Sequence, residues 1–205
     1  MTKYISHLDL MRCMTRAIKR AAIPAWYTEG FNPHLFITFA LPLTLGVESL
    51  CESMDIRLTE EMGFEEVKNR LNVNLPDGIR ITNVAVPVYK ANDIAFAEYK
   101  ITFHTRKNEK IKNEIEEKLL CDELLAEKMG KQGKRKVLKT INLKEFVNSY
   151  SVISLNDKTV LTAVLTAGSK NNINPFVDAL KLGDDVGFCE ILKQKMMTED
   201  LKSFE

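Results

Sequence analysis

The residues best suited to chemistry lie at the start of a predicted helix. His7 and Asp9 are followed on this helix by two arginines, Arg12 and Arg16. The free N–H groups and the dipole at a helix N-terminus favour anions, and guanidinium groups bind phosphate or carboxylate. We therefore interpret these four residues as a candidate anion site. A capping aspartate beside a solvated basic helix face explains the same residues without any ligand.

A loop after this helix combines aromatic residues, a glycine and a second histidine. Bases and other flat ligands stack on aromatic rings, so the loop is a candidate ligand site. The structural alternative is a rigid turn, with Phe31 in the core and Pro33 fixing the backbone. The candidate ligand-binding residues of this loop, together with one acidic residue further along the chain, are Tyr27, Gly30, Phe31, Asn32, His34 and Glu48.

Two histidines raise the possibility of acid–base chemistry or a metal. His7 and His34 could transfer protons in RNA cleavage, and with Asp9 or Glu48 they could bind a divalent ion. Their spacing matches no metal motif, so no metal site is predicted, and they are catalytic candidates only if the protein is a metal-independent ribonuclease. The four cysteines include no Cys-x-x-Cys pair and no group able to hold a zinc ion or an iron–sulfur cluster.

Charge is segregated along the chain although the formal net charge is only +1. Residues 48–66 hold seven acids against Arg57, and this stretch could face a basic partner. Residues 128–144 hold seven bases and no acid, which is typical of a loop that contacts phosphates, or of a solvated connection. The candidate RNA contacts are Lys19, Arg20, Lys131, Lys134, Arg135 and Lys136.

Length and composition place the chain among soluble globular proteins. It has 205 residues, of which 45% are hydrophobic and 28% charged, enough for one large domain or two small ones. Because it contains neither an apolar run of about 20 residues nor a signal-peptide core, we predict a cytoplasmic protein that is neither secreted nor inserted in a membrane.

Periodicity predicts two α+β modules. The first half reads as a helix from His7 to about Ala21 with Ser6 as its N-cap, then strands 36–40 and 53–58, helix 64–71 and strand 79–84. The second half reads as strand 98–104, helix 108–125, strands 137–147, 149–155 and 159–165, a helix from 174 and a helix over 186–197. The predicted fold is two ferredoxin-like (split β-α-β) modules, over 1–90 and 91–205, with helices packed on antiparallel sheets.

Several uncommon combinations occur in order near the N-terminus: K-Y-I-S-H-L-D-L-M-R over 3–12, G-F-N-P-H over 30–34, L-P-L over 41–43 and L-G-V-E-S over 45–49. With these motifs the chain resembles the bacterial radical-SAM-linked protein family, domain of unknown function 2344, which occurs alone or joined to B12-binding-type radical SAM proteins. The resemblance implies a radical SAM partner and, more loosely, a connection to RNA. It also implies that the chain itself holds no cofactor, since any iron–sulfur cluster, SAM or B12 would belong to the partner.

The chain departs from the family pattern in two places. Family members usually carry a short β-strand ahead of Lys3 and Tyr4, so either the first module lacks its first strand or the true start lies upstream. The unpaired sheet edge could then pair with a second copy and form a homodimer. Asn174 occupies the position at which family members tend to have an arginine, so no role of that arginine is expected in this chain.

Taken together, these features favour a non-catalytic binding module. It would present RNA of tRNA or rRNA type, or another anionic substrate, to a partner radical SAM enzyme. One alternative is a metal-independent ribonuclease of the CRISPR-repeat-associated type, which rests on analogy of fold. The other is a protein–protein adaptor without affinity for RNA.

Overall fold

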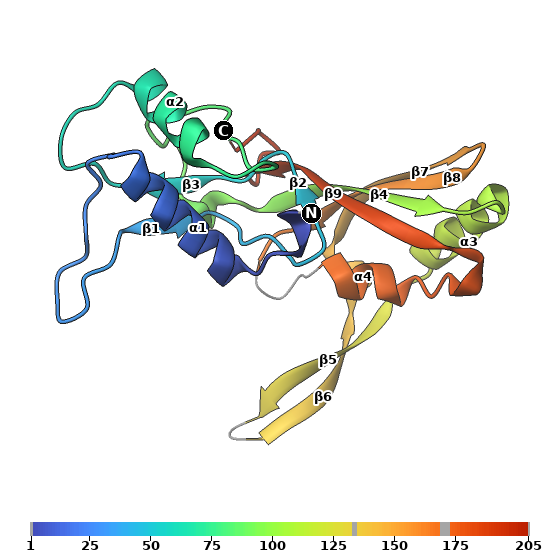
Figure 1. Ribbon diagram of the computed structural model, residues 1–205. Helices are drawn as coiled ribbons and strands as arrows, with labels where there is room; N and C mark the ends of the chain where they lie inside the picture. The colour runs from blue at the N-terminus through green and yellow to red at the C-terminus, as the bar shows by residue number, and fades with distance from the viewer. Residues whose placement is uncertain (1, 133–134, 169–172, 205) are drawn as a thin grey trace. The chain divides into compact units, whose positions relative to one another are not determined.

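The computed structural model describes residues 2–132, 135–168 and 173–204 and divides the chain into two compact units (Figure 1). The first unit comprises Met1–Gly46 and Glu52–Asp93, and the second comprises Val47–Cys51 and Ile94–Phe204. A short segment from the N-terminal half therefore belongs to the second unit. Among the helices of the described residues, none combines the length and apolar character that a membrane span requires.

Helix α1 (His7–Arg20) closely follows the sequence prediction. The Ser6 hydroxyl accepts a hydrogen bond from the Asp9 backbone N–H at 3.1 Å and donates one to the Asp9 carboxylate at 2.7 Å. This cap satisfies an N–H group that the helix itself leaves without a partner. Met14, Ala17 and Ile18 are buried on one face, which leaves the opposite, basic face in solvent.

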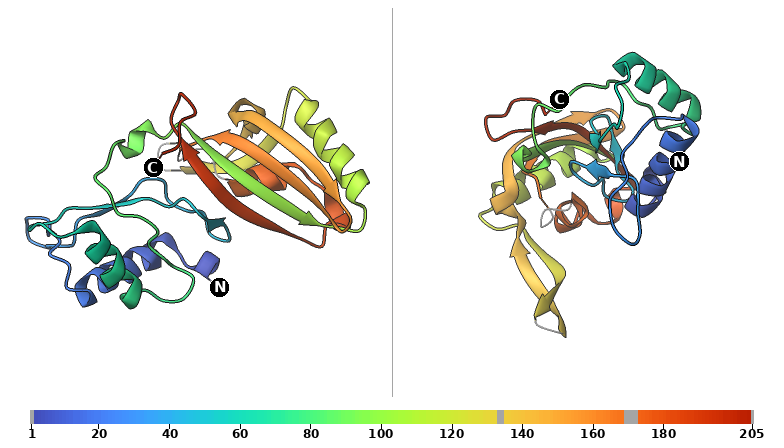
Figure 2. Two further views of the ribbon diagram at one scale, coloured as in Figure 1. Left: turned by 90° about the horizontal axis from the view of Figure 1, so that it is seen from above. Right: turned by 90° about the vertical axis from the view of Figure 1, so that its left-hand side faces the viewer.

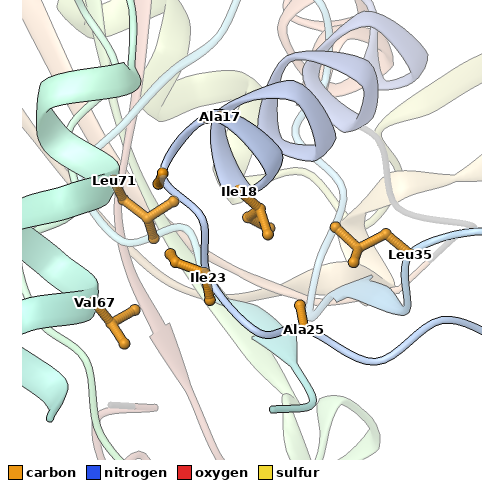
Figure 3. Packing of buried hydrophobic residues seen from close by; sticks show 8 residues of the cluster. Ala17, Ile18, Ile23, Ala25, Leu35, Val67 and Leu71 are labelled. Carbon is orange, nitrogen blue, oxygen red and sulfur yellow. The ribbon is translucent and has the colours of Figure 1, made fainter. Parts of the chain in front are cut away.

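The core of the first unit lies between two helices and a small sheet. Helix α2 (Phe64–Asn74) packs against α1, and strand β1 (Ile37–Phe39) pairs antiparallel with β3 (Met54–Ile56). The buried cluster draws residues from α1, α2 and the loops between the elements (Figure 3): Ala17, Ile18, Ala21, Ile23, Ala25, Leu35, Val67 and Leu71. The apolar stripe of residues 7–21 thus forms the buried face of helix α1. One side of the small sheet and helix α2 cover this face.

The strand predicted over 79–84 is not formed. The backbone of Ile81 hydrogen-bonds instead to the side chain of Asn72, with its N–H on Oδ1 at 2.8 Å and its carbonyl accepting from Nδ2 at 2.9 Å. Ile81 and Val84 still pack against the core cluster, which explains the apolar alternation. An asparagine side chain therefore satisfies the backbone groups that a neighbouring strand would otherwise pair.

The second unit contains the complete split β-α-β arrangement. Apart from β2 and a hairpin inserted after the first helix, its elements follow one another as strand, helix, two strands, helix and strand, and its five-stranded sheet has the order β2-β9-β4-β8-β7. Strand β2 (Glu48–Ser49) is added in parallel at the β9 edge, and the other neighbours are antiparallel. The elements are β4 (Phe96–His104), α3 (Asn108–Leu120), β7 (Val147–Leu155), β8 (Lys158–Thr166), α4 (Ile173–Ala179) and β9 (Phe188–Met197).

The predicted α+β class, with helices packed on antiparallel sheets, is confirmed. In the second unit α3 packs against β7 and β8 with buried Ile111, Ile115 and Leu119 (Figure 2). In the first unit two helices cover a two-stranded sheet, in place of the four strands of the split β-α-β template.

The helix predicted over 186–197 is wrong, because this segment forms strand β9. Its Glu, Lys, Gln, Leu and Met residues have high helix propensity. Ile191 and Lys193 are both buried on the same side of the strand. Because one of these buried positions holds a lysine, the sequence does not show the apolar alternation that would indicate a strand. The backbone ladder with β4, which runs from Phe96 to His104, outweighs local preference.

The basic segment predicted as a loop is a β-hairpin of strands β5 (Leu125–Gln132) and β6 (Arg135–Asn142). It is inserted between α3 and β7, and it projects away from the five-stranded sheet (Figure 2, right). Antiparallel pairing continues over eight residue pairs, from Leu125 opposite Asn142 to Gln132 opposite Arg135. The predicted strand 137–147 therefore starts earlier and ends earlier than expected.

A charged cluster joins the beginning of α3 to the segment before β9. The Asp185 carboxylate accepts hydrogen bonds from the ammonium groups of Lys107 and Lys110, each at 2.6 Å. The Thr105 hydroxyl donates to the Asp185 carbonyl at 2.7 Å. The bonds from Lys107 and then from Lys110 lower the pKa of Asp185 to about 2.

This cluster predicts a pH dependence of stability. Because the unfolded-state pKa of an aspartate is about 3.9, the ionised Asp185 stabilises the folded protein above that pH, and the contribution disappears as the pH falls to about 2. The difference in melting temperature between wild type and Asp185→Asn should be complete at about pH 6 and close to zero at about pH 2. Thermal melts across this range measure it, with Asp184→Asn as the control. A difference that does not change with pH would contradict the prediction.

Candidate arginine groove and aromatic loop

Three arginines line a groove on the first unit. Arg12, Arg16 and Arg20 follow one another at intervals of four residues on α1, so their Cα atoms rise by about 6 Å per step along the helix. The opposite wall is formed by the end of α2 and the residues after it, Val73 to Pro76. The groove has a volume of about 600 Å³, and Asp9 and Cys13 complete its lining. We call this feature the arginine groove.

The three guanidinium groups differ in their contacts. Arg12 donates to the Asp9 carboxylate at 3.2 Å, and Arg20 donates to the Asn74 carbonyl at 2.6 Å. Arg16 lies between them on the helix, and within the described part of the chain its guanidinium has no hydrogen bond or ion pair. The groove therefore holds three cations against one carboxylate; the Arg16 guanidinium has all its donors available to an anion, and Arg12 and Arg20 keep further N–H donors beside the bonds they make.

The role of Asp9 in this site is structural. The hydrogen bond from Ser6, followed by that from Arg12, lowers the pKa of the Asp9 carboxyl. Asp9 consequently remains ionised at neutral pH, caps α1 and orients Arg12. The expected anion site is thus partly assembled, with Asp9, Arg12 and Arg16 together and with Arg20 added to them.

His7 does not line the arginine groove. Its imidazole packs edge-on against Phe39 of β1, with 5.3 Å between ring centroids. His34 lies in the loop after α1, where its Nδ1 is 3.0 Å from the Thr28 hydroxyl and 3.3 Å from the Asn32 carbonyl. Over the described residues, no contact joins the two imidazoles and no cluster of three potential metal ligands exists.

The aromatic loop, residues 27–35, is a closed and ordered turn. An antiparallel bridge pairs Tyr27 with Leu35, and the Thr28 N–H donates to the His34 carbonyl at 2.8 Å. Gly30 has φ +125°, a value that other residues rarely adopt, so the turn requires glycine here. Phe31 is fully exposed at 105% of its reference area, which excludes the predicted alternative of a core residue.

One contact links the aromatic loop with the basic face of α1. The Lys19 ammonium lies 5.5 Å from the centre of the Tyr27 ring, within the range of a cation–π interaction. Lys19 directly precedes Arg20 of the arginine groove. The helix and the loop, proposed as separate candidate sites on sequence grounds, therefore meet at Tyr27.

The remaining candidate residues lie in the second unit. Glu48 belongs to β2, where it is paired with Leu192. Lys131, Arg135 and Lys136 are in the β5–β6 hairpin, where the structure describes the backbone but not these side chains, and Lys134 lies outside the described residues.

The far wall of the arginine groove was not predicted from the sequence. Val73 to Pro76 follow the apolar positions of α2 and show no chemical signature of their own. The regular spacing of Arg12, Arg16 and Arg20 was a usable signal, because residues four apart share a helix face. What the spacing could not indicate is which element would stand opposite those arginines.

Comparison with known proteins places the chain in a family. No curated protein matches it. Among solved structures it is similar to a chain in "Crystal Structure of a Cbf5-Nop10-Gar1 Complex", with a TM-score of 0.45 and 13% identity over 89% of this chain and 44% of that chain, so it spans less than half of that protein's length. A family model described as "Uncharacterized protein conserved in bacteria (DUF2344)" matches residues 1–175, and the protein belongs to this family.

Proposed function

We propose that the protein is a binding module that holds RNA, or a similarly polyanionic substrate, in the arginine groove and presents it to a partner enzyme. The observation that carries this proposal is the available guanidinium of Arg16 between Arg12 and Arg20. A guanidinium binds phosphate through two parallel hydrogen bonds, which makes arginine well suited to nucleic-acid backbones.

The spacing of the arginines favours a polymer over a single phosphate. Three cations that repeat about every 6 Å along a helix can contact successive phosphates of one strand. Each contact releases condensed counterions, so binding should depend strongly on salt. The β5–β6 hairpin adds six bases against Glu127 between Leu125 and Asn142 and supports a second contact with the same class of substrate.

The partner is proposed to be a radical SAM enzyme, as the resemblance implies. On this proposal the enzyme supplies the iron–sulfur cluster, SAM or B12 and performs the reaction. The arginine groove supports this division of roles. Its arginines bind anions, and the carboxylate in its lining, Asp9, is already engaged by Ser6 and Arg12. The protein then contributes affinity and position.

A filter-binding titration tests the proposal. Purified protein is titrated with bulk tRNA and with ribosomal RNA fragments at two salt concentrations. Binding that weakens by about tenfold or more between about 50 and 200 mM salt is expected for several phosphate contacts. Charge reversal of Lys134, Arg135 and Lys136 should reduce it further if the hairpin takes part. Absence of RNA binding at the lower salt concentration would refute the proposal, and tight capture of the radical SAM partner alone would identify an adaptor.

A further inference from the structure

A second group of residues lies on the outer face of the small sheet in the first unit. Trp26, Phe36 and Arg57 come from three separate segments that pair with one another. The Trp26 N–H donates to the Arg57 carbonyl at 2.7 Å, and the Phe36 N–H donates to the Trp26 carbonyl at 3.0 Å. Trp26 therefore lies between Phe36 and Arg57, one step beyond the last β1–β3 pair, Ile37 and Ile56. We call these three residues the stacking platform.

The side chains of the stacking platform interact directly. The Arg57 guanidinium carbon lies 5.1 Å from the centre of the Trp26 ring, and the Phe36 ring meets the same indole edge-on at 5.7 Å. Their neighbours Ala25 and Leu35 point to the opposite side of the sheet and are buried in the core cluster. The side chains of the platform therefore lie outside the core, and Phe36 is 39% exposed.

An unpaired nucleobase fits the chemistry of this surface. Proteins hold single-stranded RNA by stacking its bases on aromatic rings and on arginine planes, whereas the bases of a duplex are not accessible for stacking. The platform offers both kinds of surface in contact with each other. Asp55, which is paired with Thr38, is a carboxylate on the same strand face and limits the positive charge there.

The platform and the proposed phosphate site are joined by a short stretch of chain. Tyr27 follows Trp26 and, because side chains alternate along an extended segment, its ring lies on the other side, under the ammonium of Lys19, the residue before Arg20 of the arginine groove. We propose that Trp26, Phe36 and Arg57 stack unpaired bases of the RNA that the arginine groove binds, so that the substrate is single-stranded RNA. This inference rests on the proposed function and adds the substrate class to it.

The protein contains one tryptophan and five tyrosines, so fluorescence excited selectively at tryptophan reports on the platform. The probes are a 12-nucleotide oligouridylate, a 12-base-pair RNA duplex and inorganic polyphosphate. The single strand should quench the fluorescence of Trp26 and bind more tightly than the duplex. Polyphosphate should bind with strong salt dependence but leave the fluorescence unchanged, because it carries no bases.

Variants of the exposed ring complete the test. Phe36→Ala should weaken binding of the single strand by about fivefold or more, the usual effect of losing one stacking residue, and leave polyphosphate binding unchanged. Phe36→Leu retains apolar packing without the aromatic ring and should show the same selective loss even if the alanine variant folds poorly. Phe64→Ala removes another exposed phenylalanine of the first unit, on α2, and should change neither affinity.

The outcomes separate this inference from the function on which it rests. If single strand and duplex bind equally, without quenching and without an effect of the Phe36 variants, the platform does not stack bases, although the arginine groove still binds phosphates. The same result is expected if the platform docks a protein. If none of the three probes binds in a salt-dependent manner, the proposed function itself is refuted.

Discussion

Replacing Arg12, Arg16 and Arg20 together by alanine is expected to weaken RNA binding by about 100-fold at about 50 mM salt. Each lost contact with a phosphate of a single strand should reduce the slope of log affinity against log salt by about 0.7, so the triple variant should lose about 2 of that slope. The fold should persist, because the three side chains project from the exposed face of α1. Fluorescence anisotropy with a labelled oligonucleotide at several salt concentrations measures both quantities.

The control for this variant removes the same charge elsewhere. Arg80, Lys90 and Arg106 are exposed outside the arginine groove, and their triple alanine variant should retain most of the affinity. Arg16→Lys is a finer test, because it retains the charge but loses the planar fork that binds phosphate through two bonds. Equal weakening by the two triple variants would show that net charge alone drives binding, and the arginine groove would then not be the site.

Ile18→Ala should produce the largest loss of stability, about 2–5 kcal/mol. Ile18 is 1% exposed at the centre of the core cluster, between α1, α2 and the small sheet. Alanine would remove the apolar surface of the side chain and leave a cavity that its neighbours can fill only in part. Because the same helix carries the three groove arginines, this variant should also release RNA at a lower urea concentration than the wild type.

Urea denaturation followed by circular dichroism measures this effect as a lower midpoint with an unchanged slope. Leu8→Ala provides the matched control, since Leu8 lies on the same helix but is 58% exposed. Its effect should stay within about 0.5 kcal/mol. A loss below about 1 kcal/mol for Ile18→Ala would mean that this core does not hold α1 in place.

Locally determined features were predictable from the sequence. Helix α1 was expected at its observed start with Ser6 as its cap, because a serine followed by an apolar stripe of period 3.6 determines a helix within a few residues. The order of elements around β4, α3, β7 and β8 was likewise predictable from alternation and periodicity. The chemistry of the candidate site was visible as well, since Arg12, Arg16 and the aromatic loop were selected on residue type and spacing.

Features that depend on distant partners were not predictable. Residues 186–197 favour a helix by propensity, but β4 and β2 on either side of them impose a strand. Residues 79–84 alternate like a strand, but the Asn72 side chain occupies the backbone groups of Ile81. In both cases a partner outside the segment, the strands β4 and β2 or the side chain of Asn72 nine residues earlier, outweighs a local preference of less than about 1 kcal/mol per residue.

The same division applies to function. The sequence by itself determined the basic face of α1 and the aromatic residues of the loop that follows, because residue type and helical period suffice to define both. Only the tertiary structure decided that Val73 to Pro76 enclose the arginines as a groove, and that Trp26, Phe36 and Arg57 form one surface. The physical reason is that a binding surface requires side chains from several segments, and their proximity is created by the packing of the core and the pairing of strands.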